Sequence, residues 1–391
     1  MLDYERRSAV TTLREPAPLA VRASLGVRPI LRSVSKRTIV LALTILGMGV
    51  CVSVSAGARS QISPCTAVSQ PVWSPDGTQI AYYGTRWPHP KNHHHSAGNN
   101  LLQALCTMDG NGQNAQQLRY TVCSEKCVDP PYQIDWLHSG ELIYLIDGDL
   151  YRLAPGQKPK RFARRVDSPS FATDAAGDRL AAGFGFPGCL TCGGPVTVLD
   201  VPSGHVVGKV GGKKFDNAYP SLSPDGSQVV FERDAADDSS RTFGIWTARA
   251  NGKDLRHLLR KGFQPLWSPA SGGKIAFRGY VKNVESLRLV SPNGRGVRTL
   301  VPRGVSTVFG WSPDGKSIAF ELGSGTFGKL AVVDVATGKI RQLLKLYYSP
   351  TADWTPDSQD LVVDTSPNPK ECSSVWRVPV DGSKPRLLRS C

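Results

Sequence analysis

One short unit recurs along the chain, and it limits the possible folds more than any other feature of the sequence. Each copy contains an apolar or aromatic anchor, a Ser-Pro-Asp-Gly turn or a variant of it, and then an alternating apolar run. Successive anchors lie between 35 and 63 residues apart, a spacing that is typical of repeat architectures. The clear copies are PVWSPDGTQIAYY (71–83), PSLSPDGSQVVFE (220–232), PLWSPASGGKIAF (265–277), FGWSPDGKSIAFE (309–321) and ADWTPDSQDLVVD (352–364), and the weaker copies are QIDWLHSGELIYL (133–145) and PSFATDAAGDRLAAG (169–183).

The residue types of the unit predict a turn followed by a strand. Proline presets φ at the second turn position, aspartate accepts hydrogen bonds from its own backbone, and glycine closes the turn. The alternating run that follows is typical of a half-buried strand, and a second glycine turn lies between two further strands. Four antiparallel strands per unit make the blade of an all-β propeller, for which we predict seven blades, with six as the alternative. The predicted blade anchors are Trp73, Trp136, Phe171, Leu222, Trp267, Trp311 and Trp354.

The Trp-Ser-Pro-Asp-Gly pattern and its Ile-Ala-Phe run resemble the PD40, or WD40-like, repeat of the TolB propeller group, over residues 59–391. The resemblance implies a propeller fold and a functionally mixed family. TolB-type proteins have six blades behind a separate N-terminal domain, for which this chain has no room. Peptidases with related propellers add an α/β-hydrolase domain with a Gly-x-Ser-x-Gly elbow, and the sequence contains no such elbow. We therefore interpret Asp76, Asp225 and Asp314 as turn residues and the repeated tryptophans as packing between blades.

The N-terminal segment predicts export from the cytoplasm. Residues 1–37 carry eight basic and three acidic residues, and residues 38–58 form an uncharged apolar run. A run of this length can span the hydrocarbon core, and its basic flank favours a cytoplasmic N-terminus. The end of the run, Ala56-Gly57-Ala58, also fits a signal cleavage site. We predict a disordered basic tail (1–37), a transmembrane anchor or signal segment (38–58) and an extracytoplasmic propeller (59–391), either tethered to the membrane or secreted.

The cysteines agree with this placement. Cys51 lies in the apolar run, and an even number of cysteines follows it, which favours disulfides in an exported domain while leaving their pairing open. Two short pairs, Cys189-x-x-Cys192 and Cys123-x3-Cys127, resemble zinc half-sites, but no second pair completes four ligands at a familiar spacing. The eight cysteines after the run are Cys65, Cys106, Cys123, Cys127, Cys189, Cys192, Cys372 and Cys391.

The alternation of strand direction predicts one face of short turns and one face of irregular loops, where binding residues usually lie. The predicted loops are 84–101, 184–195, 233–243, 322–328, 365–373 and 121–132. Basic residues follow the fourth strand of several units, and at related positions they would form an arc around the channel mouth. This arc is the predicted binding site for an anionic partner, with solubilising rim charge as the alternative. Its members are Arg164, Arg165, Lys213, Lys214, Arg260, Lys261 and Arg303.

The sequence favours a non-catalytic platform that binds a protein or an anionic envelope component and does not bind nucleic acid. It contains no recognisable catalytic triad context, no phosphate-binding glycine loop and no His-Glu-x-x-His motif, and we predict no cofactor and no metal site. The alternative is a propeller enzyme that acts on a polysaccharide, assisted by a metal at His89 and His93–His95. An acidic group, Glu232 with Asp234, Asp237 and Asp238, lacks the spacing and glycine of a calcium loop. The partner, the ligand and the oligomeric state are not predicted.

Overall fold

The computed structural model describes part of the chain. The chain divides into two compact units, Met1–Arg59 and Ser60–Cys391, and every described residue belongs to the second. The predicted tail 1–37 and the apolar run 38–58 therefore lie outside the described residues. No helix in the described part is both long enough and apolar enough to cross a membrane. The described residues are 65, 67–86, 102–122, 133–146, 149–164, 171–183, 194–212, 215–235, 243–270, 272–324, 327–347, 350–366 and 373–390.

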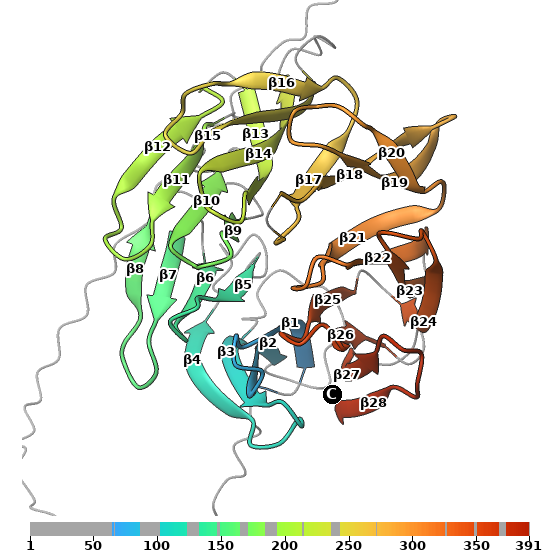
Figure 1. The fold of residues 1–391 in the computed structure, drawn as a ribbon. Coiled ribbons are helices and arrows are strands. Elements are labelled where there is room, and N and C mark those ends of the chain that lie inside the picture. The colour runs from blue at the N-terminus through green and yellow to red at the C-terminus, as the bar shows by residue number, and fades with distance from the viewer. Residues whose placement is uncertain are drawn as a thin grey trace, which may run out of the picture. The chain divides into compact units, whose positions relative to one another are not determined.

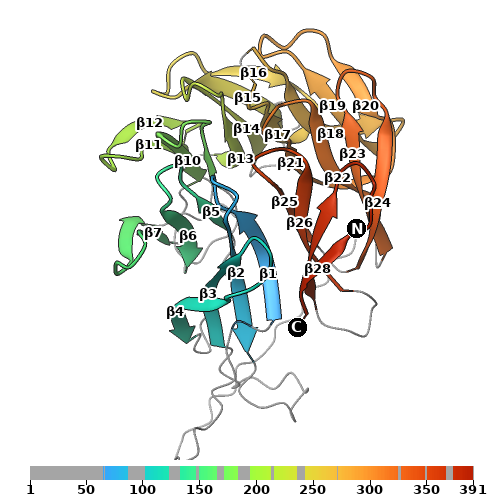
Figure 2. The same ribbon diagram turned by 60° about the horizontal axis from the view of Figure 1, so that its bottom comes forward.

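The described strands confirm the predicted all-β propeller with seven blades. They form seven sheets of four antiparallel strands, each sheet built from four consecutive strands, and Figure 1 shows the sheets arranged around a common centre. Within a blade, the first strand is the innermost and the fourth is the outermost. Figure 2 shows the same arrangement from a second direction.

The first three blades are bounded as follows. Blade 1 contains β1 (Ala67–Trp73), β2 (Gln79–Arg86), β3 (Leu102–Asp109) and β4 (Gln116–Val122). Blade 2 contains β5 (Ile134–Trp136), β6 (Leu142–Ile146), β7 (Asp149–Leu153) and β8 (Lys160–Ala163). Blade 3 contains β9 (Phe171–Thr173), β10 (Arg179–Gly183), β11 (Val196–Asp200) and β12 (Val206–Val210).

The other four blades follow the same order. Blade 4 contains β13 (Phe215–Leu222), β14 (Gln228–Ala235), β15 (Gly244–Arg249) and β16 (Arg256–Leu259). Blade 5 contains β17 (Phe263–Trp267), β18 (Ile275–Val281), β19 (Val284–Val290) and β20 (Arg298–Val301). Blade 6 contains β21 (Val305–Trp311), β22 (Ser317–Ser324), β23 (Phe327–Asp334) and β24 (Ile340–Tyr347). Blade 7 contains β25 (Thr351–Trp354), β26 (Asp360–Thr365), β27 (Ser374–Pro379) and β28 (Arg386–Arg389).

The Ser-Pro-Asp-Gly turns have the structural role that the sequence predicts. In blade 1 the Ser74 hydroxyl donates to Asp76 Oδ1 at 2.6 Å, and the same carboxylate accepts from the Thr78 backbone N–H at 3.0 Å. The Ser74 hydroxyl and the Thr78 N–H hold the pKa of Asp76 below its ordinary value. Gly77 has φ of 69°, in the left-handed region that favours glycine. The same serine-to-aspartate bond recurs at Ser223–Asp225 and Ser312–Asp314, and as Thr355–Asp357 in blade 7.

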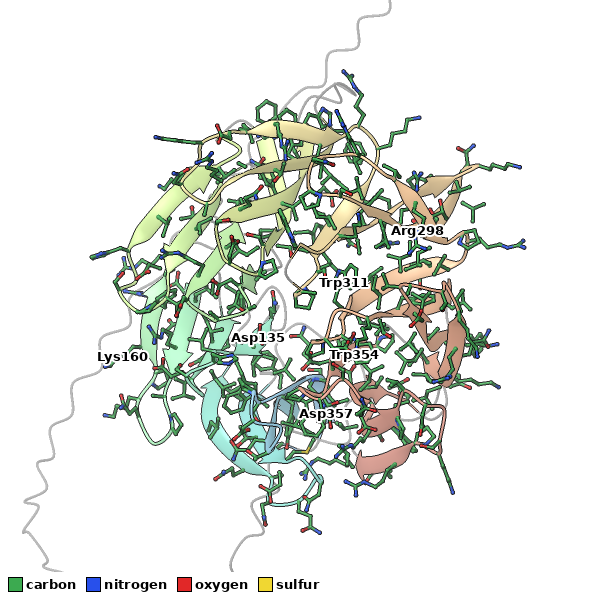
Figure 3. The ribbon with its side chains drawn as sticks, viewed as in Figure 1. Asp135, Lys160, Arg298, Trp311, Trp354 and Asp357 are labelled. Atoms are coloured by element: carbon green, nitrogen blue, oxygen red, sulfur yellow. A yellow bond between two sulfur atoms is a disulfide. The ribbon has the colours of Figure 1, made fainter. Side chains whose placement is uncertain are left out.

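The anchor tryptophans join neighbouring blades. The indole Nε1–H of Trp136 donates to the Val72 carbonyl of blade 1, and Trp311 and Trp354 make the equivalent bonds to the blade before theirs. Figure 3 shows Trp311 and Trp354 on the inner side of their sheets, whereas Lys160 and Arg298 lie at the outer edge. Because the interaction crosses the blade boundary, each of these three tryptophans fixes the packing of two sheets.

The predicted anchor of blade 3 is wrong by two residues. Phe171 pairs with Ala182, whereas Thr173 pairs with Leu180 immediately before the turn, as Trp73 pairs with Ile80 in blade 1. The turn after Thr173 lacks the proline of the clear copies of the repeat, so the large apolar Phe171 is the stronger sequence signal. Phe171 is buried in the core that blades 2 and 3 share.

The ring closes without exchanging a strand between the first and last blades, among the residues that the structure describes. Blade 7 instead holds blade 1 through side chains. Asp353 Oδ2 accepts from the Trp73 backbone N–H at 2.8 Å, and Asp364 Oδ2 accepts from the Gln70 N–H at 3.2 Å. The first strand of the ring is therefore fixed by two carboxyl groups that lie about 280 to 294 residues later in the chain.

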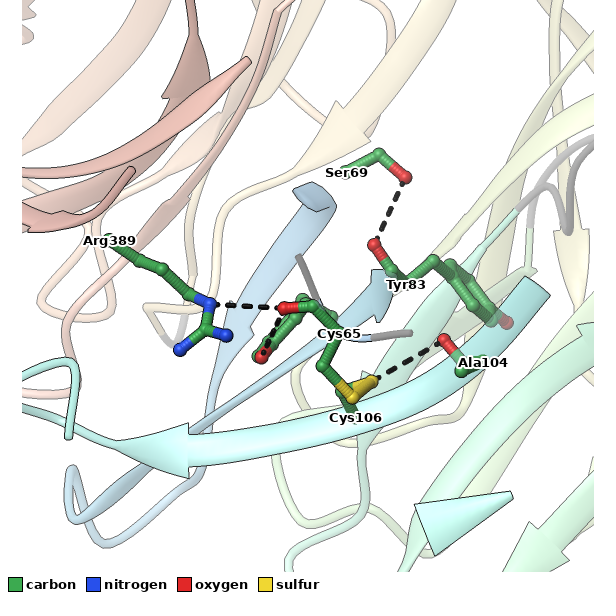
Figure 4. The surroundings of a disulfide bond; sticks show 7 residues. Cys65, Ser69, Tyr83, Ala104, Cys106 and Arg389 are labelled. Atoms are coloured by element: carbon green, nitrogen blue, oxygen red, sulfur yellow. Dashed lines mark hydrogen bonds between the residues drawn. A yellow bond between two sulfur atoms is a disulfide. The ribbon is translucent and has the colours of Figure 1, made fainter. Parts of the chain in front are cut away.

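A disulfide strengthens blade 1 at the same junction. Cys65 and Cys106 are bonded, with their Cα atoms 6.0 Å apart, and the Cys65 carbonyl accepts from Arg389 Nε of blade 7 at 3.0 Å (Figure 4). The bond links the residues that precede β1 to β3 and so reduces the freedom of the unfolded chain. The other six cysteines after the apolar run, and Cys51, lie outside the described residues.

Candidate functional site

The two faces of the propeller differ as the sequence predicts. Successive strands run in opposite directions, so the first-to-second and third-to-fourth connections share one face, which we call the turn face. The remaining connections share the opposite face, which we call the loop face. The connection from β1 to β2 is five residues long, whereas the connection from β2 to β3 on the loop face covers fifteen. Long connections on a rigid scaffold are the usual carriers of binding residues.

Three predicted loops are clearly shorter than expected. β22 continues to Ser324 and β23 begins at Phe327, so most of 322–328 is strand rather than loop. β14 likewise continues to Ala235, into the predicted loop 233–243, and β2 continues to Arg86, into the predicted loop 84–101. In each case the backbone pairing of the hairpin extends into the predicted loop.

Part of the predicted basic arc lies on the loop face. Arg164 follows β8, Arg260 and Lys261 follow β16, and Arg303 lies two residues after β20. The four side chains are exposed, and none of them forms an ion pair with another described residue. Arg165, Lys213 and Lys214 lie outside the described residues. That this arc binds an anionic partner remains a prediction.

Three carboxyl groups near the inner strands were not singled out from the sequence. Asp135 on β5 and Asp353 on β25 each precede the tryptophan anchor of their blade, and Figure 3 places Asp135 on the inner side of the ring. Protein surrounds both carboxyls, although each residue keeps a partly accessible surface. Asp364 on β26 is 6 % exposed, and its Oδ1 accepts from the Thr351 hydroxyl at 2.8 Å.

Burial raises the pKa of all three groups. The pKa of Asp135 rises to about 6, and the pKa of Asp353 rises to about 7, with a further upward contribution from the charge of Asp135. The pKa of Asp364 rises to about 7, although hydrogen bonds from Thr351, Gln70 and its own backbone N–H act in the opposite direction. At all three carboxyls, the loss of hydration therefore raises the pKa by more than hydrogen bonding lowers it. Carboxyls with a pKa near neutrality can transfer protons at physiological pH.

A buried cation lies towards the loop-face end of blade 4. Arg233 on β14 is 3 % exposed, and burial lowers its pKa to about 10, so the side chain is charged at neutral pH. Its Nε donates to Asn217 Oδ1 at 3.1 Å and its Nη2 to the Gly211 carbonyl at 2.5 Å. The guanidinium also lies 4.0 Å from the ring centre of Trp246 and 4.4 Å from that of Phe215. Among the described residues, these π contacts and hydrogen bonds, rather than an ion pair, stabilise the charge.

The residues of the predicted metal alternative, His89 and His93–His95, lie outside the described part. Of the separate acidic group that lacks the pattern of a calcium loop, Asp237 and Asp238 also lie outside it. Glu232 is described, and its Oε2 accepts from the Gln264 backbone N–H at 3.0 Å, which joins blade 4 to blade 5. Glu232 thus has the same role between blades 4 and 5 that Asp364 has between blades 7 and 1. No group of three or more potential metal ligands occurs among the described residues.

Comparison with known proteins supports the fold and carries no functional assignment. No protein-family model and no curated protein matches this chain. Among solved structures, oligogalacturonate lyase from Vibrio parahaemolyticus aligns with a TM-score of 0.57 and 12 % identity, over 81 % of this chain and 90 % of that chain. The β-propeller domain of the Trilobed protease from Pyrococcus furiosus, reported to have an open velcro topology, aligns with a TM-score of 0.56 and 10 % identity, over 83 % and 98 % of the two chains.

TolB from Acinetobacter baumannii is also among the similar structures. It aligns with a TM-score of 0.48 and 17 % identity, over 78 % of each chain. At these identities the likeness concerns the fold alone, because the same fold serves both binding proteins and enzymes.

Proposed function

We propose that the protein is a non-catalytic binding platform outside the cytoplasm, which presents its loop face to an anionic protein or envelope component. The observation that carries this proposal is the placement of Arg164, Arg260, Lys261 and Arg303. All four are exposed, lie on the loop face of a rigid ring and have no carboxylate partner among the described residues. Unpaired cations on one face attract anionic partners and raise the rate of encounter.

Neutralising the arc is expected to weaken capture of the partner. The combined variant Arg260→Gln, Lys261→Gln and Arg303→Gln removes three positive charges from blades 4 and 5. We expect at least a ten-fold weaker retention of envelope components by the full chain, together with a smaller dependence of retention on salt, because fewer ionic contacts are screened. The measurement is a pull-down from the envelope fraction over a series of salt concentrations.

The matched control is Lys253→Gln with Lys316→Gln and Lys339→Gln, which removes the same charge from the turn face. This control is expected to leave retention unchanged. Equal retention by the loop-face variant and the wild-type chain, or retention that does not depend on salt, would contradict the proposal.

A second candidate function is cleavage of an acidic polysaccharide, and one observation favours it. Asp135 and Asp353 are partly accessible residues, and the pKa values of their carboxyls, about 6 and about 7, suit a general acid or base at neutral pH. If they are catalytic, Asp135→Asn and Asp353→Asn should each lower the release of new chain ends from oligogalacturonate by at least a hundred-fold. A wild-type chain that releases none from a panel of acidic polysaccharides removes this candidate.

A further inference from the structure

Exposed apolar residues divide into a repeated set and a set that does not repeat. Nine large apolar residues are exposed in the described part of the chain. Six lie at the turn-face ends of outer strands, at related positions in different blades, and are a feature of the repeat itself. These six are Leu118, Val206, Leu255, Val297, Ile340 and Leu387. The other three, Tyr280, Val284 and Phe327, lie on the loop face of blades 5 and 6.

The blade 5 part of this second set is held rigidly. Tyr280 is 53 % exposed, and the centre of its ring lies 5.6 Å from the centre of the Phe263 ring. The Arg278 guanidinium lies over the Phe263 ring, 4.7 Å from its centre. The hairpin tip between β18 and β19 consists of only Lys282 and Asn283, with φ of 50° and 63°. Two left-handed residues in a two-residue connection are typical of the tight hairpin turn that matches strand twist. Such a tip loses little conformational entropy when a partner binds.

The blade 6 part is held in a similar way. Phe327 is 63 % exposed and is paired in register with Tyr347 on the adjacent strand β24. The two rings meet edge to face with their centres 5.6 Å apart. Blades 5 and 6 are neighbours that share one buried core, so the two pairs of rings lie on adjacent sheets. We call the rings of Phe263, Tyr280, Phe327 and Tyr347 the aromatic rim.

The charge around the aromatic rim is positive. Seven basic and two acidic residues lie in the loop-face segments of blades 5 and 6 and at the end of β16. These segments are 260–264, 278–286, 301–307, 321–329 and 345–347. Glu285 is ion-paired with Arg278, and Glu321 is 9 % exposed. The exposed cations of these segments are therefore not balanced by exposed carboxylates. They are Arg260, Lys261, Lys282, Arg303, Lys329 and Lys345.

We propose that the aromatic rim and its cations form a docking surface for an acidic protein segment that also carries apolar side chains. This inference rests on the proposed platform function and names the class of partner. Aromatic residues and arginine are enriched at protein interfaces, and pre-packed rings are suitable anchors. Positive charge selects an acidic partner, whereas the exposed Val284 and the ring of Phe327 select apolar side chains that a purely ionic polymer lacks.

The test compares two labelled peptides of equal length and equal negative charge. One alternates glutamate with phenylalanine and leucine, and the other alternates glutamate with serine. Fluorescence anisotropy with the full chain at near-physiological salt is expected to show at least ten-fold tighter binding of the peptide with apolar side chains. The double variant Tyr280→Ser and Phe327→Ser is expected to remove this preference while leaving the weak ionic binding of the serine peptide in place.

The matched control is Val206→Ser with Ile340→Ser, which removes two exposed apolar residues from outer strands and is expected to keep the preference. Equal binding of the two peptides, or a preference that survives the loss of Tyr280 and Phe327, would overturn the docking surface. Tighter binding of oligogalacturonate than of either peptide, weakened by the same double variant, would assign the surface to a polysaccharide and also overturn it.

The same variants separate this inference from the platform function. If neutralising Arg260, Lys261 and Arg303 abolishes capture from the envelope while the ring variant captures normally, the platform function stands and the aromatic docking surface is rejected. If the charge variant also captures normally, both are rejected.

Discussion

The free energy of unfolding is expected to fall as the pH rises from about 4 to about 7, and Asp364 is a principal cause. The folded-state pKa of Asp364 is about 7, above the ordinary value of 3.8, because burial disfavours the carboxylate. A raised pKa means that folding takes up a proton in this window, so the stabilisation is complete below the ordinary pKa and is lost as the pH passes 7. Three pKa units correspond to at most about 4 kcal/mol.

The variant Asp364→Asn is expected to flatten this dependence. The amide cannot ionise, but it loses one acceptor for the N–H groups of Gln70 and Thr351, so it should be about 1–2 kcal/mol less stable than the wild type at pH 5. At pH 8 the wild type must keep a buried carboxylate, and the variant should equal or exceed it. Denaturant unfolding of the wild type and the variant at pH 5 and at pH 8 measures this change in their relative stability. Asp135 and Asp353 titrate in the same direction, so a residual slope should remain.

Asp357→Asn is the matched control for this experiment. The Thr355 hydroxyl and the Gln359 N–H lower the pKa of Asp357 in its turn, so its contribution is present above the ordinary pKa and is lost only at lower pH. Between pH 5 and pH 8 this variant should differ from the wild type by a constant amount. A wild-type stability that rises over this range, or an Asp364→Asn curve parallel to the wild type, would show that the junction carboxyl is not buried as described.

Replacing Arg233 with alanine is expected to lower the free energy of unfolding by about 3–5 kcal/mol. The change leaves Asn217 Oδ1 and the Gly211 carbonyl without a donor and opens a cavity between Phe215 and Trp246. Arg233→Met fills much of that space and should recover the packing part, leaving about 1–3 kcal/mol for the lost hydrogen bonds. Chemical denaturation of the two variants separates these contributions.

Arg256→Ala provides the comparison for Arg233. Arg256 is exposed and donates from Nη2 to the Pro292 carbonyl of the next blade at 2.7 Å. A single exposed bond of this kind should contribute less than about 1 kcal/mol. If Arg233→Ala lowered the free energy of unfolding by no more than Arg256→Ala does, the buried guanidinium would not be a stabilising part of blade 4.

The tertiary structure, not the repeat, determines where the unusual chemistry of this protein lies. Asp353 belongs to a clear copy of the repeat, and Asp135 belongs to a weaker one, yet the sequence motif shows neither as buried. Their surroundings come from other blades: Asp353 accepts from Trp73, a residue 280 positions earlier. Burial and pKa depend on such distant neighbours, which a local pattern does not contain.

The misplaced anchor Phe171 and the loop 322–328 show the limit of local signals within the fold. The third unit lacks the turn proline, so the size of Phe171 outweighed the position of Thr173. In blade 6 the backbone pairing of β22 and β23 continues to Ser324 and Phe327 although the apolar alternation has ended. Both differences arise because inter-strand pairing, which the motif does not record, decides the register.

The amino-acid sequence alone determined the architecture of this protein: seven small sheets, their turns and the tryptophans between them. Those features depend on turn conformation and on alternation of apolar residues, which neighbouring residues in the chain control. The packing of the closed ring decided the rest, namely which carboxyls lose their water, how Arg233 is compensated and why Tyr280 and Phe327 remain exposed. Exposure and electrostatic environment are properties of surfaces that come together only when distant segments meet, so they were decided by the tertiary structure.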